Sequence, residues 1–480
     1  MTVVEWAGLP MLAAVALGLV ATGLPAFVVL IGVALLFASL GLALGVLPVS
    51  VLTALPLRII GLLENDLLQA LPLYVLMGAL LNRLPLADIL FRAGNALFAR
   101  TAAAPLLSAI GLGALLAPMN GSVGASAATL SRVVEPRLLA SGVSAPRGLA
   151  LVSLASTLGV VVPPSLVLIL LGDSMLRAHT EAINATHLAA RVINTQDVFQ
   201  GALPPALLFL ALAIAVAWLV GRGERMPVVP APRLRPGEWL TAIVTLAAIL
   251  ALLAAVVSGH LYAVEAAATG AVALFGFGLV SRQLDGPVLA ALLRDTMGIA
   301  GALFALFVGA TTFTLVFRAL GAEAPIAALI QAIPGGALGT GVATLVLLGL
   351  CALVLDAFEI ILVIVPLVMP PLLTRVPDAV WLSALTLLAL QTSFLLPPFG
   401  YAVMTVRTLS AERVSDGAMT RALVPFLAAQ LVVLALTVAF PGLTHLAQPS
   451  DAAAPPRSDA QVRQQLENIV PIAPSESDEH

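Results

Sequence analysis

The chain breaks one apolar segment at Leu395-Leu396-Pro397-Pro398-Phe399-Gly400 and another, in its first half, at Val161-Val162-Pro163-Pro164-Ser165. Upstream of each proline pair a second apolar segment is interrupted, by Asn120-Gly121-Ser122 and by Leu355-Asp356-Ala357 respectively. The two separations agree, because 163 − 122 and 397 − 356 both equal 41. A helix broken inside a bilayer frees backbone groups that are tolerated only where they line a cavity or hold a ligand. Paired breaks in two halves of a membrane chain therefore predict a transporter's central binding site.

The composition indicates the class of protein. Hydrophobic residues make up 60% of the 480 positions and charged residues 10%, and the mean hydropathy is +1.09. A soluble domain carries about 25% charged residues. Spans of about 20 residues leave room for roughly ten to twelve spans plus some half-length segments. We therefore predict an all-α polytopic membrane protein.

Other global features exclude several classes. The net charge of −3 gives no reason to expect a nucleic-acid partner, and the chain has no Walker A pattern that would indicate ATP hydrolysis. We expect no cofactor. The single cysteine, Cys351, permits no internal disulfide, and the N-terminus holds Glu5 and no basic leader, which favours a first span over a cleaved signal.

The arginines predict an orientation in the membrane. Segment 222–236 holds four arginines against one glutamate and is predicted to be a cytoplasmic linker by the positive-inside rule. Under one threading, the basic residues near Arg83–Arg100 and Arg137–Arg147 fall on the same side. In this threading both ends of segment 103–140 lie on the cytoplasmic side, so we predict a re-entrant hairpin there. The alternatives are an ordinary loop between two spans, or small residues that only pack helices.

The second half repeats the plan with the opposite sense. We predict two inverted repeats, residues 1–221 and 237–442. The first holds the hairpin at about 103–140 and a broken helix at about 149–176, and the second holds a hairpin at about 338–373 and a broken helix at about 381–408. The polar residues 443–480 are predicted to be a disordered tail.

The carboxylates inside apolar segments are candidate ion ligands. A charge at the bilayer centre costs at least about 2.5–3.5 kcal/mol, so such residues usually face a cavity and bind ions or carry protons. Asp356 suits Na⁺, and Glu359 lies close to one turn further on. The alternative for both is a carboxylate paired with an arginine. Gln391-Thr392-Ser393 offers uncharged oxygens, or serves only to bond neighbouring helices.

Five stretches together resemble the large membrane subunit of the tripartite ATP-independent periplasmic (TRAP) transporters, the DctM-like permeases. They are Met119–Ser126, Gly159–Ser165, Glu265–Ala268, Leu355–Ile360 and Gln391–Gly400. The second-hairpin and second-break stretches resemble the branch called mannitol/chloroaromatic-type. The resemblance runs from Gly23 to near Pro441.

The resemblance implies uptake of a small organic anion, commonly a carboxylate, driven by a Na⁺ gradient across a bacterial inner membrane. It implies a periplasmic binding protein and a small DctQ-like subunit of four membrane helices. It also implies a fold of the ion-transporter-superfamily type, in which the hairpins and broken helices move like an elevator against a fixed scaffold. The implied Na⁺ ligands are Ser122, Val162, Asp356 and Leu396. The implied binding residues are Asn120, Gly121, Ser122, Gly124, Ser126, Pro163, Pro164, Ser165, Asp356, Glu359, Gln391, Thr392, Ser393, Pro397, Pro398 and Gly400.

The chain also departs from the family pattern. Leu396 stands where this branch usually has a threonine, and Val143 stands where a tyrosine is usual. The Arg177–Gln200 loop is predicted to be unusually long. Two other functions are alternatives: an intramembrane aspartyl hydrolase using Asp173 and Asp356, and a stand-alone Na⁺- or H⁺-coupled carrier.

Overall fold

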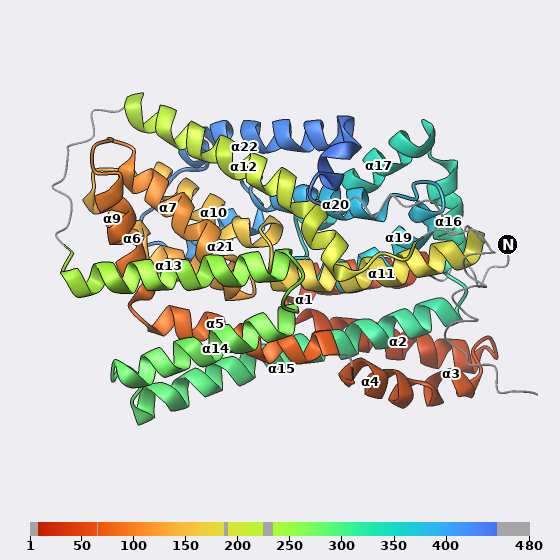
Figure 1. The fold of residues 1–480 in the computed structure, drawn as a ribbon. Coiled ribbons are helices and arrows are strands. Elements are labelled where there is room, and N and C mark those ends of the chain that lie inside the picture. The colour runs from red at the N-terminus through yellow and green to blue at the C-terminus, as the bar shows by residue number, and fades with distance from the viewer. Residues whose placement is uncertain (1–7, 65, 187–190, 224–233, 449–480) are drawn as a thin grey trace, which may run out of the picture.

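The computed structural model describes residues 8–64, 66–186, 191–223 and 234–448, and every regular element in these ranges is helical (Figure 1). The predicted all-α class is therefore confirmed. Most of the predicted linker (224–233) and of the predicted tail (449–480) lies outside the described residues.

The first half of the chain forms helices that are mostly separated by turns of a few residues. They are α1 (Gly8–Thr22), α2 (Ala26–Ala43), α3 (Val49–Thr53), α4 (Leu55–Leu63), α5 (Asp66–Arg83), α6 (Leu86–Leu97), α7 (Ala104–Leu116), the 3₁₀ turn η2 (Pro118–Asn120), α8 (Val123–Val133), α9 (Glu135–Ala140), α10 (Ala145–Val161), α11 (Leu166–Thr186) and α12 (Thr195–Gly223).

The second half holds the longest helix, α15, and a π-helical segment, η3. Its elements are α13 (Pro236–Val257), α14 (Ala263–Val280), α15 (Gly286–Ala319), α16 (Glu323–Ala332), α17 (Gly336–Cys351), α18 (Ala357–Glu359), η3 (Ile360–Ile364), α19 (Val365–Leu373), α20 (Ala379–Phe394), α21 (Tyr401–Leu409), α22 (Asp416–Ala439) and the 3₁₀ turn η4 (Pro441–His445).

The described helices include fewer full-length spans than the sequence predicted. Seven are long and apolar enough to cross a membrane, or eight if the bent pair Val49–Leu63 and Leu68–Arg83 counts as one span. Five shorter apolar helices accompany them. The expectation of ten to twelve spans was too high because the chain uses several apolar stretches as half-length helices that meet at a break.

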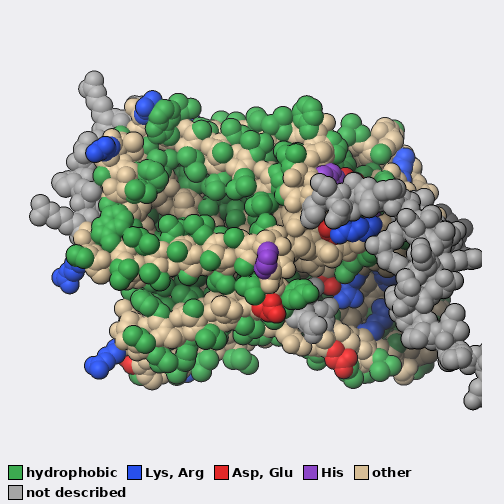
Figure 2. Space-filling model, viewed as in Figure 1, with side chains coloured by type: hydrophobic (Ala, Val, Ile, Leu, Met, Phe, Trp, Pro, Cys, Tyr) green, Lys and Arg blue, Asp and Glu red, His purple; other side chains and the backbone are tan. Residues whose placement is uncertain are grey.

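The helices form two layers. In Figure 1, α2–α5, α14 and α15 make up the lower layer, where α15 packs along α2 and α5, and α14 packs along α5. The hairpin helices α7, α8, α17 and α19 and the broken helices lie above it. Figure 2 shows hydrophobic side chains over most of this face, with blue side chains toward its two ends. This surface is that of a chain surrounded by lipid.

The basic segments gather at one end of the molecule. The helices α6 and α9, and the ends of α12 and α13 that flank residues 224–233, lie together at the left of Figure 1. The sequence threading placed these segments on one side. Their assignment to the cytoplasm stays a prediction.

Segment 177–200 differs from the predicted long loop. Helix α11 continues to Thr186 and α12 begins at Thr195, so only a short connection separates them. The pair Asp173–Arg177, with 3.0 Å between carboxylate and guanidinium, is spaced at four residues and supports the helical continuation.

Candidate functional site

The first hairpin turns between α7 and α8 through residues that suit a tight reversal. Pro118 begins the short 3₁₀ turn η2, and Gly121 follows with a φ of +79°, a conformation that favours glycine. Ser122 then caps α8, because its Oγ accepts a hydrogen bond from the Ala125 amide at 3.1 Å. The Ser126 hydroxyl donates to the Ser122 carbonyl at 2.9 Å. The tip is therefore ordered by its own neutral polar groups.

Neighbouring helices approach the backbone of this tip closely through glycines. A Cβ atom at Gly159 of α10 would lie 2.5 Å from the Ala117 carbonyl oxygen. A Cβ atom at Gly78 of α5 would lie 2.9 Å from the Asn120 Cα. Only hydrogen fits at either position, so α10 and α5 hold the hairpin tip between them.

The first break separates α10 from α11. Helix α10 ends at Val161, the Pro163-Pro164 peptide bond is cis, and Ser165 caps α11 by accepting from the Leu168 amide at 3.2 Å. Both prolines and Ser165 are buried. The proline pair lacks amide donors and cannot continue the helix, which explains why the break falls where the sequence predicted.

The second hairpin uses a carboxylate where the first uses a hydroxyl. Asp356 caps α18, because its side chain accepts from the Ala357 amide at 2.6 Å. Glu359 accepts from the Asp356 amide at 3.1 Å, which completes a capping box. The following segment, η3, is π-helical, and one of its carbonyls, that of Ile361, accepts from the Ser174 hydroxyl of α11 at 2.9 Å. This hydrogen bond joins the second hairpin to the half-helix that follows the first break.

The second break has the same construction but is more open. Helix α20 ends at Phe394, and the Pro397-Pro398 peptide bond is also cis. A Cβ atom at Gly400 would lie 2.5 Å from the Phe394 carbonyl oxygen, so the turn closes tightly. In contrast to the first break, the side chains of Leu396 and Phe399 are 45% and 66% exposed.

Two side chains join the halves. The Gln391 side-chain amide of α20 lies 3.5 Å from the Thr157 hydroxyl of α10, so the two broken helices meet. Tyr401, the first residue of α21, packs against the first hairpin: a Cβ atom at Gly124 would lie 2.9 Å from its hydroxyl. Tyr401 therefore connects the second break to the first hairpin.

Sequence reasoning missed Tyr401. Its signal was its position, because it directly follows Gly400 and begins the half-helix that leaves the second break.

Several buried polar atoms at this junction have no hydrogen-bond partner among the described residues. They are both amide atoms of Asn120, which is 5% exposed, and the Oε1 atom of the fully buried Gln391. A buried polar group without a partner costs about 1–3 kcal/mol. Such atoms are natural contacts for a polar ligand or an ion.

The structure gives several of the predicted binding residues local roles. The Thr392 hydroxyl donates to the Leu388 carbonyl of its own helix at 2.7 Å, and Ser126 likewise bonds within its hairpin. Ser393 packs against Gly349 of α17, whose Cβ atom would lie 3.1 Å from the Ser393 hydroxyl. Local hydrogen bonds account for the first two hydroxyls, whereas Ser393 has a role in helix packing.

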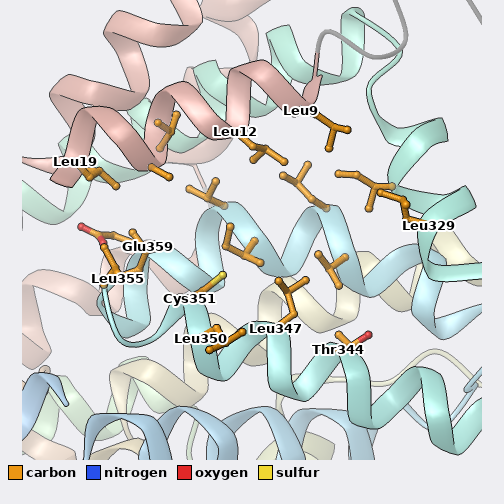
Figure 3. Close-up of a pocket in the computed structure, with 18 of the residues that line it drawn as sticks. Leu9, Leu12, Leu19, Leu329, Thr344, Leu347, Leu350, Cys351, Leu355 and Glu359 are labelled. Atoms are coloured by element: carbon orange, nitrogen blue, oxygen red, sulfur yellow. The ribbon is translucent and has the colours of Figure 1, made fainter. Parts of the chain in front are cut away.

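Glu359 lies at the margin of a different cavity. This cavity, about 710 Å³ in volume, opens between α1 and the second hairpin, and Figure 3 shows Glu359 at one end beside Leu19 and Leu355. The remaining labelled side chains in Figure 3 are leucines, with Thr344 and Cys351. The cavity is too apolar to hold a small anion, so we do not place the anion site there.

The part of the chain that the structure describes contains no group of three or more histidine, cysteine, aspartate or glutamate side chains that could hold a metal ion. The backbone carbonyls at the helix breaks are a different kind of ligand. They are the groups that bind Na⁺ at the ends of broken membrane helices.

A multi-span helical chain with a hairpin and a broken helix in each half belongs to the class of secondary membrane transporters. More narrowly, this chain belongs to the family described as "Tripartite ATP-independent periplasmic transporter, DctM component", whose sequence profile matches residues 13–443. The resemblance to TRAP large permeases is thereby confirmed. The chain is a transporter subunit of the bacterial inner membrane and not an enzyme, which removes the intramembrane hydrolase alternative.

Two relatives and one solved structure illustrate the similarity. The chain is 23% identical over 396 residues to the C4-dicarboxylate TRAP transporter large permease protein DctM of Pseudomonas aeruginosa, covering 82% of this chain and 88% of that protein. It is 25% identical over 444 residues to the sialic acid TRAP transporter large permease protein SiaM of Vibrio cholerae, covering 90% and 96%.

The fold is similar to the crystal structure of the Alcanivorax borkumensis YdaH transporter, described as having an unusual topology. The TM-score is 0.57 at 18% identity, covering 83% of this chain and 89% of that chain. The mannitol/chloroaromatic-type branch and the limits of the two repeats stay predictions.

Proposed function

We propose that this chain is the membrane subunit that imports a small organic anion, a carboxylate, together with Na⁺. The observation that carries the proposal is the junction of two hairpin tips and two helix breaks, with unpartnered polar atoms of Asn120 and Gln391 buried nearby. Four helices, α8, α11, α18 and α21, begin at these tips and breaks. The free amides and positive dipole ends of helix N-termini favour an anion.

The coupling ion is proposed to bind the opposite kind of helix end. Helices α10 and α20 end at the breaks, and their last carbonyls, near Val162 and Leu396, are oxygen ligands of the kind that Na⁺ prefers. Ser122 would complete the first site and Asp356 the second. Leu396 contributes no hydroxyl, so the second site relies on the Asp356 carboxylate. Na⁺ would then help to organise the anion site, which is coupling by reciprocal linkage.

The proposed partners are a small four-helix membrane subunit and a periplasmic binding protein. The names of both relatives call those proteins large permeases of TRAP transporters. A stand-alone carrier is the alternative. Uptake of labelled succinate or sialic acid into proteoliposomes distinguishes the two, because our proposal expects uptake only with a Na⁺ gradient, the small subunit and the binding protein together.

The Na⁺ site can be tested without a known solute. We expect the melting temperature of the purified chain to be higher in NaCl than in KCl or choline chloride, because a ligand that binds only the folded state stabilises it by about 4.1 kcal/mol at 1,000 times its dissociation constant. In Asp356→Ala the Na⁺-specific rise should shrink.

Asp285→Ala is the matched control. Asp285 also caps a helix, by accepting from the Val288 amide at 2.9 Å, but it lies at the exposed start of α15. This variant should lose some stability in every salt and keep the full Na⁺ response. Equal melting of the wild type in all three salts would contradict Na⁺ binding by this subunit alone.

A further inference from the structure

A second, polar cavity lies between the two layers, away from the helix breaks. Its volume is about 340 Å³, with α4 and α15 on one side and α11, η3 and α19 on the other. Figure 2 shows blue and red side chains together between the layers toward the right end of the molecule. This cavity differs from the apolar cavity of Figure 3 because charged side chains line it. They are Arg58, Asp173, Arg177, Glu181 and Arg318.

The two walls of this cavity are polar faces of regular helices. Asp173, Arg177 and Glu181 follow one another at intervals of four residues and share a face of α11. Thr311, Thr314 and Arg318 share a face of α15 in the same way. Polar residues inside a membrane protein usually face the interior of the helix bundle or a water-filled cavity, as these two faces do.

Arg318 bridges the layers at the outer part of this cavity. Its Nη2 atom donates to the Glu181 carboxylate of α11 at 3.1 Å, while its Nε atom lies 2.7 Å from the Glu323 carboxylate. Glu323 thus lies against the Nε atom and Glu181 against the Nη2 atom, so each carboxylate contacts a different nitrogen of the guanidinium. The Arg318 and Glu181 side chains are 33% and 42% exposed, and ion pairs this exposed to water contribute little net stability.

The cavity and the first helix break share one helix, α11. Its lining includes Ser174, which bonds the carbonyl of Ile361. Along α11, Asp173 is eight residues from Ser165, the cap at the break, a distance of about 12 Å at 1.5 Å per residue. A solute beside Asp173 would therefore lie about 12 Å along α11 from the first break, where the anion site is proposed.

We propose that this cavity is a carboxylate-binding site, in which the carboxylate of a small organic anion replaces that of Glu181 on Arg318. A guanidinium presents a planar fork that fits any carboxylate, and the incoming group takes the place of a side chain with the same chemistry. Arg58 supplies a second positive charge, and it has no ion-pair partner among the described residues. The exchange removes a bond between the layers, since Glu181 belongs to α11 and Arg318 to α15. The inference rests on the proposed function of anion import.

The test measures succinate binding to the purified full chain by its melting temperature, at constant Na⁺ and ionic strength. In Glu181→Gln the competing carboxylate is gone. The succinate concentration that gives half of the maximal rise in melting temperature should therefore fall about tenfold. In Arg318→Gln that concentration should rise at least about tenfold. Arg318→Lys keeps the charge without the planar fork and should lie between Arg318→Gln and the wild type.

The matched control is Arg83→Gln, which breaks the ion pair between Arg83 of α5 and Asp295 within the lower layer. It should bind succinate like the wild type. If Glu181→Gln and Arg318→Gln respond to succinate like the wild type, or if no variant responds at all, the proposal is wrong.

An uptake measurement separates this proposal from the proposed function. In the complete transport system, Glu181→Gln should lower the KM for the anion and Arg318→Gln should raise it. A wild-type system that takes up no anion contradicts the proposed function. Uptake with a KM that neither variant changes contradicts only the carboxylate site at Arg318.

Discussion

The two helix breaks share a backbone plan but differ in burial and charge. Each has a cis proline pair, and each follows a hairpin whose second arm is capped by a side chain. The first break is buried, and its hairpin tip, Pro118–Ser126, holds no charged side chain. At the second break Leu396 and Phe399 are exposed, and the hairpin tip carries Asp356. The plan itself therefore does not need a charge, and the role of the Asp356 carboxylate beyond the cap is what the following predictions test.

The largest expected effect comes from filling the close approaches at the two breaks. Gly159→Ala places a methyl group 2.5 Å from the Ala117 carbonyl oxygen, and Gly400→Ala places one 2.5 Å from that of Phe394. Both contacts are with backbone, so each substitution should cost about 1–3 kcal/mol or more of stability. Thermal unfolding of the purified chain measures this.

Gly111→Ala in α7 is the control, because a Cβ atom there meets no heavy atom within 4 Å. It should be neutral or stabilising, since alanine is favoured over glycine in helices by about 1 kcal/mol. Equal melting of Gly159→Ala and Gly111→Ala would show that the first break is not closely packed. The first break would then not be more closely packed than the second.

A second, smaller effect separates the two caps. Ser122→Ala removes a neutral cap and should cost about 0.5–2 kcal/mol in Na⁺ and in choline alike. Asp356→Asn keeps a capping oxygen but removes a charge that costs about 2.5–3.5 kcal/mol at the bilayer centre. This variant should therefore be at least as stable as the wild type in choline chloride and should lose the part of the Na⁺ response that depends on Asp356.

Melting curves in the two salts test this contrast. Asp356→Ala, which removes both the charge and the cap, serves as the reference for complete loss of the side chain. If Asp356→Asn lowered stability in both salts as Ser122→Ala does, Asp356 would be only a cap, and the two tips would be equivalent.

The smallest expected effect concerns the start of α20, which is held by a titratable contact. Asp378 caps α20 and also accepts a hydrogen bond from His445, 2.8 Å away. Burial alone would lower the pKa of His445, but its hydrogen bonds to Gln448 and Asp378 outweigh burial and hold the pKa above its usual value. Stability from this contact is therefore fully present below about pH 6.5, the unfolded pKa, and is lost as the pH rises through the folded pKa.

The melting temperature at pH 6 and at pH 8 measures this contribution, which solvent screening keeps below about 1 kcal/mol. The difference in melting temperature between pH 6 and pH 8 should be smaller in His445→Gln than in the wild type. His260→Gln, on the turn before α14, is the control and should leave it unchanged. An equal pH dependence of the melting temperature in His445→Gln and the wild type would show that the His445–Asp378 contact does not contribute to stability.

The sequence predicted the breaks well because their causes are local. Proline lacks an amide hydrogen, so the positions of Pro163-Pro164 and Pro397-Pro398 determine where α10 and α20 end. The cap at Ser122 and the turn at Gly121 follow from short-range chemistry in the same way. The Na⁺ and substrate roles of these residues stay predictions.

What the sequence did not predict depends on contacts between distant residues. Tyr401 and Gly124 are far apart in the chain, and no periodic pattern indicates that they meet. The hydrogen bond from Ser174 to the Ile361 carbonyl depends on how α11 packs against a π-helical segment. The Arg318–Glu181 pair joins residues 137 positions apart, so only the packed structure reveals it.

The length of α15 has a further consequence. The helix is 34 residues long and is held in its first third by the Arg83–Asp295 pair and at its last turn by the Arg318–Glu181 pair. Asp295 and Arg318 are 23 residues apart, or about 35 Å along the axis, compared with about 30 Å for a typical hydrocarbon core. A helix that exceeds the core tilts, and the tilt changes with bilayer thickness. We therefore expect lipid chain length to change the tilt of α15, and through the tilt the geometry of the Arg318–Glu181 contact between the layers.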